Sequence, residues 1–534
     1  MLTRGAWLFV VVFAGAIGHA GPPAASMGSA GPARADDRTI VHALNRIGFG
    51  PVPGDVDRIR RTGLAQYLDA QLEPQNISDS GVAARLATFH TLQLSTRDLA
   101  DRYFVPAMME RRQAKSQADP SSTADAPMDG RRRAPVQRAA MMQERDVLWE
   151  LAEQKILRAA YSERQLQEVM VDFWFNHFNV FAGKGATRVY LTGYERDTIR
   201  PNALGTFRRL LGATAESPAM LFYLDNWESA APATSRIDSR ARRSRQPARA
   251  SEAARRVRGL NENYARELME LHTLGVDGGY TQRDVQEVAR AFSGWTIAAP
   301  RQGGGFRFDP RMHDDGAKAV LGHRIRAGGG QTDGEQVLDI LAAHPATSRF
   351  IATKLVRRFV SDVPPPALVE RAAAVYRDTG GDIREVVRAI VTSPEFFAPE
   401  AYRAKVKTPF EFVASAIRAT AYDAPNARPL VRATRDLGMP LYFCQPPTGY
   451  ADRADAWVNT GALLNRMNFA IALTRGDLRG GEPSTGSARA GADAVTRDVL
   501  ADDVSEVTRS TVARAPEPAQ AVALLLGSPE FQRK

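Results

Sequence analysis

The chain has 534 residues, enough for one large domain or for several of about 150 residues each. Its composition, 44% hydrophobic and 24% charged, is that of a globular protein and excludes a wholly disordered chain. The single cysteine, Cys444, excludes a disulfide scaffold and a metal centre built from several thiolates.

The first 20 residues have the pattern of an export signal. Arg4 precedes an apolar stretch, Ala6–Ile17, that is too short to span a bilayer core comfortably. Small residues at 18–20 then provide a cleavage site, so we predict a signal peptide at 1–20 and a periplasmic or secreted protein. A retained N-terminal membrane anchor is the alternative.

Helices are predicted over most of the remaining sequence, and the predicted fold class is mainly α. Residues 36–475 form one large multi-helix domain, with polar loops at about 113–138 and 230–258. A Gly/Ser-rich linker at 476–492 and C-terminal helices at 493–534 follow. One small β-hairpin is predicted within 303–326, where Gly-Phe-Arg-Phe alternates before a polar turn and a second apolar stretch.

The positive charge of the chain is concentrated in one segment. Nine arginines between Arg236 and Arg258 face only Asp238 and Glu252, so +7 of the net +10 lies there. Because this segment has no aromatic and few aliphatic residues, it is predicted to be an exposed loop. Nucleic acid is not a predicted partner, since aromatic residues among the arginines are missing. Weak contact with an anionic surface is the functional alternative.

Two predicted helices turn ionisable groups inward. The helix at 163–178 is apolar nearly all round, which is typical of a central, buried helix, and His177 lies within its apolar arc beside Asn176. A buried imidazole needs hydrogen-bond partners or a metal ion, and a satisfied core histidine is the plainer alternative.

The second such helix, at 261–275, begins with Asn261 as N-cap and ends at Gly275. On a helical projection Glu267 lies inside the apolar arc and His272 at its other side. Glu270 lies just beyond the margin, and Arg266 points the opposite way. A lone buried carboxylate is costly unless it is paired or binds a metal, and burial against an arginine is the alternative.

The predicted hairpin turn supplies a third group of polar residues, and loops often hold functional groups. These three elements could bring together imidazoles and carboxylates as a site for a divalent metal ion. The predicted ligands are His177, Glu267, His272, His313 and Asp314, with Asn176, Glu270, Arg266 and Lys318 around them. For His313 and Asp314 a solvated turn is the alternative. No His-Glu-x-x-His motif, nucleophile elbow, phosphate-binding loop or dinucleotide fingerprint is present.

The segment from Asn261 to Trp295 resembles the hallmark of a bacterial family called domain of unknown function 1800. Shorter stretches support the resemblance, in order along about residues 40–475: 42–51, 174–178, 313–318, 407–411, 437–440 and 445–450. The resemblance implies an exported, mostly helical bacterial protein whose gene often lies beside that of a sulfatase-like family, domain of unknown function 1501. It implies no activity.

Two functions are consistent with these patterns. The first is an accessory or scaffold protein that acts with an exported partner of the sulfatase-like family. The alternative is a metal-dependent hydrolase, in which the five predicted ligands hold a metal ion whose bound water attacks the substrate. The lack of a recognised metal motif favours the first.

Overall fold

The computed structural model describes residues 35–110, 130–231, 259–478 and 490–534. The predicted signal peptide at 1–20 and the arginine-rich stretch from Arg236 to Arg258 lie outside the described residues. Within the described ranges, no helix combines the length and the apolar content that crossing a membrane requires.

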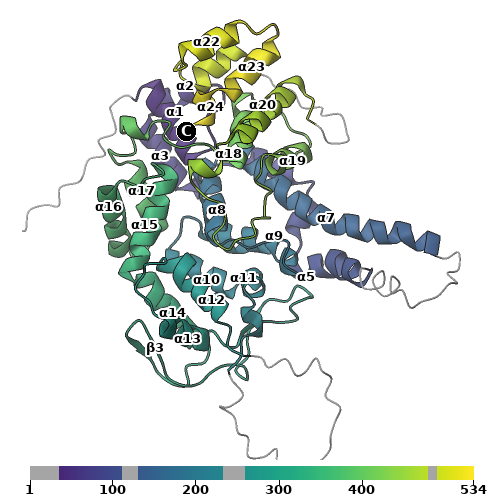
Figure 1. Cartoon of the computed structure of the whole chain (residues 1–534), viewed down its shortest axis with the longest axis vertical. Coiled ribbons are helices and arrows are strands. Elements are labelled where there is room, and N and C mark those ends of the chain that lie inside the picture. The colour runs from purple at the N-terminus through teal and green to yellow at the C-terminus, as the bar shows by residue number, and fades with distance from the viewer. Residues whose placement is uncertain (1–34, 111–129, 232–258, 479–489) are drawn as a thin grey trace, which may run out of the picture.

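The fold is mainly α-helical, as predicted (Figure 1). The helices before the arginine-rich stretch are α1 (Asp37–Ile47), α2 (Asp55–Thr62), α3 (Leu64–Leu72), α4 (Ser80–Leu86), α5 (Thr96–Leu99), α7 (Gly130–Tyr161), α8 (Gln165–His177), α9 (Leu191–Gly193), α10 (Phe207–Glu216) and α11 (Pro218–Tyr223). Those after it are α12 (Glu262–Glu267), α13 (Gln282–Ala291), α14 (Thr332–Ala343), α15 (Pro345–Phe359), α16 (Pro366–Asp378), α17 (Ile383–Val391), α18 (Pro409–Ala419), α19 (Arg428–Asp436), α20 (Thr460–Arg475), α21 (Ala492–Ala494), α22 (Glu506–Ala513), α23 (Pro518–Gly527) and α24 (Pro529–Gln532).

Helix α8 lies near the middle of the molecule, which confirms the prediction of a central helix (Figure 1). Its apolar residues face neighbours on nearly every side, and Val169, Met170 and Trp174 have no exposed surface. The Trp174 indole donates a hydrogen bond of 2.9 Å to the carbonyl oxygen of Ala203, so its one polar atom is satisfied inside the core. The C-terminal end of α8 is thereby held in place.

The β structure differs from the predicted single hairpin. Strand β1 (Trp295–Ile297) pairs with β2 (Phe306–Phe308), and β3 (Lys318–Val320) pairs with β4 (His323–Ile325), both antiparallel. The predicted pairing of the Phe306 stretch with the later residues is therefore wrong. The second hairpin closes on itself because Leu321 and Gly322 both have positive φ, the conformation that a tight two-residue turn needs. Phe306–Phe308 pairs instead with the buried strand that precedes it.

One further boundary differs from the sequence-based expectation. Helix α7 begins at Gly130, so residues 130–138, predicted as loop, are helical. The four arginines, Ala134 and Gln137 of this stretch favour a helix. The helices after residue 492 pack against α20, and Lys407 and Lys534 take part in backbone hydrogen bonds that join residues 532–534 to 405–407. The C-terminal helices are thus built into the main fold.

Candidate functional site

A cavity of about 320 Å³ lies beside the C-terminal half of α8. Its walls come from α8, from α15, from the residue that caps α18 and from the loop after α19. The lining residues are Asp172, Phe173, Asn176, His177, Lys354, Arg357, Arg358, Thr408, Met439, Thr448, Gly449, Tyr450, Ala451, Asp452 and Arg453. Charged and polar side chains from segments far apart in the sequence therefore meet around one space.

The loop wall of the cavity is fixed to α8 by Asn176. Its side-chain amide donates to the carbonyl oxygen of Tyr450 at 2.8 Å and accepts from the Tyr450 N–H at 2.7 Å. The preceding residue must be glycine, because Gly449 has a φ of +74° and an added Cβ would lie 2.2 Å from the Asn176 carbonyl oxygen. Asn176 thus shapes the cavity wall and has both ends of its amide occupied.

His177 is buried and its hydrogen bonds define its tautomer. Its Nε2 lies 3.1 Å from the carbonyl oxygen of His272, which can only accept, so Nε2 carries the hydrogen. Its Nδ1 then has the lone pair, and the Lys354 Nζ donates to it at 2.8 Å. Burial, reinforced by the charge of Lys354, holds the pKa of His177 well below its usual value, so the ring is neutral.

Lys354 and Arg357, one turn apart on α15, are cations with no acidic partner. Among the described residues no Asp or Glu oxygen lies within 4.0 Å of either. The Arg357 Nε has only a weak contact, 3.4 Å to the carbonyl oxygen of Asp362. Burial lowers the pKa of Lys354 to about 8, with Arg357 adding to the shift and Asp452 opposing it.

The acidic residues of the cavity are each matched. Asp172 pairs with Lys155 at 2.9 Å, and Asp452 pairs with Lys405 at 3.0 Å. The remaining buried cation of the wall, Arg358, pairs with Glu411. Lys405 also pairs with Asp362 at 2.5 Å, so two carboxylates share it. Lys354 and Arg357 are the lining cations that have no carboxylate within 4.0 Å among the described residues.

The 261–275 helix differs from the regular helix used for the sequence projection. Asn261 caps it as predicted, accepting from the Asn263 N–H at 2.8 Å, but Leu268–Thr273 form a wider π-helical turn. A π-helical turn rotates by fewer degrees per residue than an α-helix. The side-chain directions projected from regular α-helical geometry therefore do not apply beyond Leu268. Glu267 is only partly buried, and its pKa is raised by burial and by Glu270.

His272 is buried, as predicted, but it contributes its backbone to the site. Its carbonyl oxygen accepts the hydrogen bond from His177, and the centres of the two rings are 6.2 Å apart. The other two residues predicted nearby have partners elsewhere: Glu270 accepts from the Tyr280 hydroxyl at 3.0 Å, and Arg266 lies 3.6 Å from Glu262.

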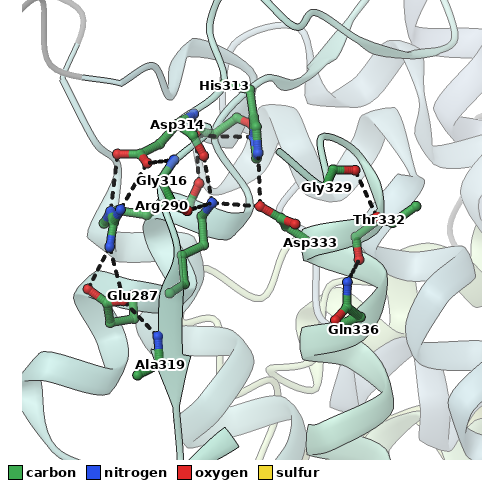
Figure 2. A network of polar contacts seen from close by, with 12 residues as sticks. Glu287, Arg290, His313, Asp314, Gly316, Ala319, Gly329, Thr332, Asp333 and Gln336 are labelled. Atoms are coloured by element: carbon green, nitrogen blue, oxygen red, sulfur yellow. Dashed lines mark hydrogen bonds and ion pairs between the residues drawn. The ribbon is translucent and has the colours of Figure 1, made fainter. Parts of the chain in front are cut away.

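His313, Asp314 and Lys318 belong to a separate buried network between α13 and α14, in which Figure 2 labels the first two. The two ring nitrogens of His313 lie 2.7 Å from the Ser293 carbonyl oxygen and 3.2 Å from Asp333. The Lys318 Nζ lies 2.6 Å from the same Asp333 oxygen, and neither side chain is exposed. Asp314 accepts two hydrogen bonds from Arg290, at 2.9 and 3.1 Å. Both predicted ligands of this turn are thus used to hold the fold together.

The predicted metal site is therefore not formed by its five residues. His177 and His272 lie together, whereas His313 and Asp314 belong to the separate network. In the part of the chain that the structure describes, no three His, Cys, Asp or Glu side chains are grouped to hold a metal ion. Both nitrogens of His177 and of His313 already have hydrogen-bond partners.

Sequence reasoning missed Lys354, Arg357 and Asp452. The signal that could have identified the first two lies in α15, where Arg358 shares the buried face of Ile351 and Leu355. An arginine on an apolar helix face indicates a charged interior space or a buried ion pair. Asp452 has no such signal, because it lies in a loop without periodicity.

The comparisons with known proteins give one match. The family model described as "Protein of unknown function (DUF1800)" matches residues 42–533. The chain belongs to this family. No curated protein and no solved structure matches the chain.

In this DUF1800 member, several segments that carry the family resemblance meet at the cavity. Stretches 174–178, 407–411, 437–440 and 445–450 each supply lining residues. The hallmark segment, Asn261–Trp295, supplies the His272 carbonyl that fixes the tautomer of His177.

Proposed function

We propose that the protein binds a small anionic molecule in the cavity beside α8, with Lys354 and Arg357 as the binding groups. The observation that carries the proposal is that these two cations line the cavity without a carboxylate partner among the described residues. The acids of the same cavity, Asp172 and Asp452, are already paired.

The chemistry of the two side chains suits an oxyanion. A guanidinium offers a planar pair of donors that matches carboxylate, sulfate or phosphate, and an ammonium adds a compact positive charge. The volume of about 320 Å³ fits a small molecule. Because the cavity walls exclude part of the solvent, the attraction between these groups and an anion is stronger than at an open surface.

Calorimetric titration of the full chain with sulfate, phosphate and pyruvate at constant ionic strength tests the proposal. We expect one molecule to bind per chain, and Arg357→Ala to weaken binding about 10- to 100-fold, the loss of about 1.5–3 kcal/mol from a charged hydrogen bond. Arg349→Ala is the matched control, because Arg349 lies on the same helix, is 68% exposed and pairs with Glu370.

Two results would overturn the proposal. One is the absence of heat of binding for all three anions. The other is binding that Arg357→Ala and Lys354→Met leave unchanged, which would place the anion elsewhere on the protein.

Export through residues 1–20 and action beside a sulfatase-like partner are further proposals, supported by the sequence pattern and the family resemblance. An anion site is compatible with an accessory protein that delivers an anionic ligand to its partner. Fractionation and cross-linking in the native host test these points, and recovery of the full-length chain in the cytoplasm would contradict the first. The metal-dependent hydrolase is not proposed, because its ligands lie apart.

A further inference from the structure

We infer that Lys354 is an activated amine that forms an imine with the carbonyl group of the bound anion. The ligand class is then a small carboxylate with a ketone or aldehyde group, such as a 2-oxo acid. The anionic part of this inference rests on the proposed function, and the amine part rests on the contacts of Lys354 itself.

The hydrogen bond of Lys354 leaves its amine free to react. Its Nζ donates to Nδ1 of a neutral His177, which is itself held by the His272 carbonyl. A neutral amine needs only one of its two N–H groups for this bond, so its lone pair stays available on the cavity side. A carboxylate partner would instead stabilise the ammonium form, and none lies within 4.0 Å among the described residues.

The surroundings of the amine favour its free form. Burial lowers the pKa of Lys354 to about 8, with Asp452 opposing the shift and Arg357 adding to it. At pH 7 the reactive free-amine form is then over one hundred times more abundant than for a lysine of unperturbed pKa, about 10.4. Desolvation and an adjacent cation are the two means by which proteins activate lysine as a nucleophile.

Each of the other described lysines has a carboxylate partner or lacks a cavity large enough for a ligand. Five of them pair with carboxylates: Lys155, Lys184, Lys318, Lys405 and Lys534. Lys407 donates to the Ser415 hydroxyl and lines a void of only about 10 Å³, room for one water molecule. Within the described ranges, only Lys354 combines an amine free of a carboxylate with a cavity large enough for a ligand.

The proposed step is balanced without an oxidant or a reductant. The Nζ lone pair attacks the carbonyl carbon, so that a C–N bond forms and the π bond of the carbonyl breaks, and one proton moves from the nitrogen to the oxygen. The resulting carbinolamine loses its hydroxyl group as water together with the remaining nitrogen proton, and the C=N bond forms. Arg357 binds the carboxylate of the same ligand, and His177 acts as a positioning residue that orients the amine.

Reductive trapping tests the inference. The full chain is incubated with pyruvate and cyanoborohydride, which reduces an imine to a stable amine, and the modified lysines are identified by peptide mass spectrometry. We expect Lys354 to be modified at least tenfold faster than the surface residue Lys184. Arg357→Ala should slow the reaction about tenfold, whereas Arg349→Ala should not.

Acetone, which has the carbonyl but no charge, separates this inference from the proposed function. If pyruvate binds in calorimetry but leaves Lys354 unmodified, the imine is wrong and the anion site stands. If Lys354 reacts equally fast with acetone and pyruvate and no anion binds, the anion site is wrong and the activated amine stands.

The role of His177 has its own readout. His177→Gln keeps a hydrogen-bond acceptor and should retain the pH midpoint of trapping, whereas His177→Leu removes the acceptor that favours the ammonium form and should lower the midpoint. Equal midpoints in both folded variants, confirmed by circular dichroism, would contradict the positioning role.

Discussion

Two buried histidine–lysine arrangements in this molecule have opposite electrostatic designs. In the α13–α14 network, Asp333 lies between His313 and Lys318, so the ammonium charge is matched by a carboxylate (Figure 2). Beside α8, Lys354 contacts the neutral His177 directly. The comparison teaches that burial of ionisable groups does not by itself mark a functional site. We propose that a buried charge marks a functional site when it has no counter-charge and lies next to an open cavity.

The largest expected effect breaks the matched network. Asp333→Ala leaves the fully buried Lys318 without its counter-charge, and losing one partner of a buried pair costs about 3–5 kcal/mol. Lys354→Met removes a cation that has no carboxylate partner to leave unpaired, so the free energy of unfolding should not fall at pH 7. Urea unfolding of both variants checks the contrast, and equal losses would contradict it.

The cavity wall gives the next largest effect. Gly449→Ala should cost about 1–3 kcal/mol from backbone strain, and additional free energy from the clash with Asn176. Gly438→Ala is the matched control, because Gly438 also has positive φ but has nothing within 4 Å of an added Cβ. Thermal unfolding should show a larger loss for Gly449→Ala, and anion binding should weaken in that variant only. Identical losses would mean that the Gly449–Asn176 contact is unimportant.

The pH dependence of stability sharpens the same comparison. Folding lowers the pKa of Lys354 from 10.5 to about 8, so between these values the unfolded chain binds more protons and stability rises with pH. Below about pH 8 the penalty for the buried ammonium is fully present in the native protein. Lys354→Met should therefore gain stability relative to the native protein at pH 7, and this gain should vanish towards pH 10.5. A gain that grows with pH would have the wrong sign.

The smallest expected effect concerns Ser293. Its hydroxyl lies 3.5 Å from His313, whose other ring nitrogen lies 3.2 Å from Asp333, so the three residue types are those of a Ser-His-Asp hydrolase triad. The Ser293 hydroxyl donates to the Arg290 carbonyl oxygen at 2.6 Å and accepts from the Asp314 N–H at 2.9 Å, and it is fully buried. Ser293→Ala should cost only about 1 kcal/mol. A fluorophosphonate probe should leave Ser293 unlabelled, and labelling would show that the network is catalytic.

Much of the fold follows from the sequence, because it depends on patterns that are local. The apolar surround of α8, the Asn261 cap and the buried position of His177 all come from residue spacing within one helix. The strand pairing of Phe306–Phe308 was missed because either flanking apolar stretch could supply a partner, and burial of Trp295 decided between them.

The site was predictable only in part, because it depends on contacts between distant segments. His177 was identified, but its partner Lys354 comes from a helix 177 positions later, and no local pattern relates the two. Glu267, which the projection places inside the apolar arc, is only partly buried, and the sequence does not reveal the π-helical turn that follows it. A helical projection assumes constant geometry and fails where the helix widens.

The pH dependence of Lys354 modification by acetic anhydride, followed by peptide mass spectrometry, shows whether Lys354 is an activated amine in an anion-binding cavity. We expect a midpoint near pH 8 and protection of Lys354 when a bound anion fills the cavity, because burial lowers the pKa of the Lys354 amine. A midpoint for Lys354 near the ordinary lysine pKa of about 10.4, or modification that no anion slows, would contradict an activated amine in an anion-binding cavity.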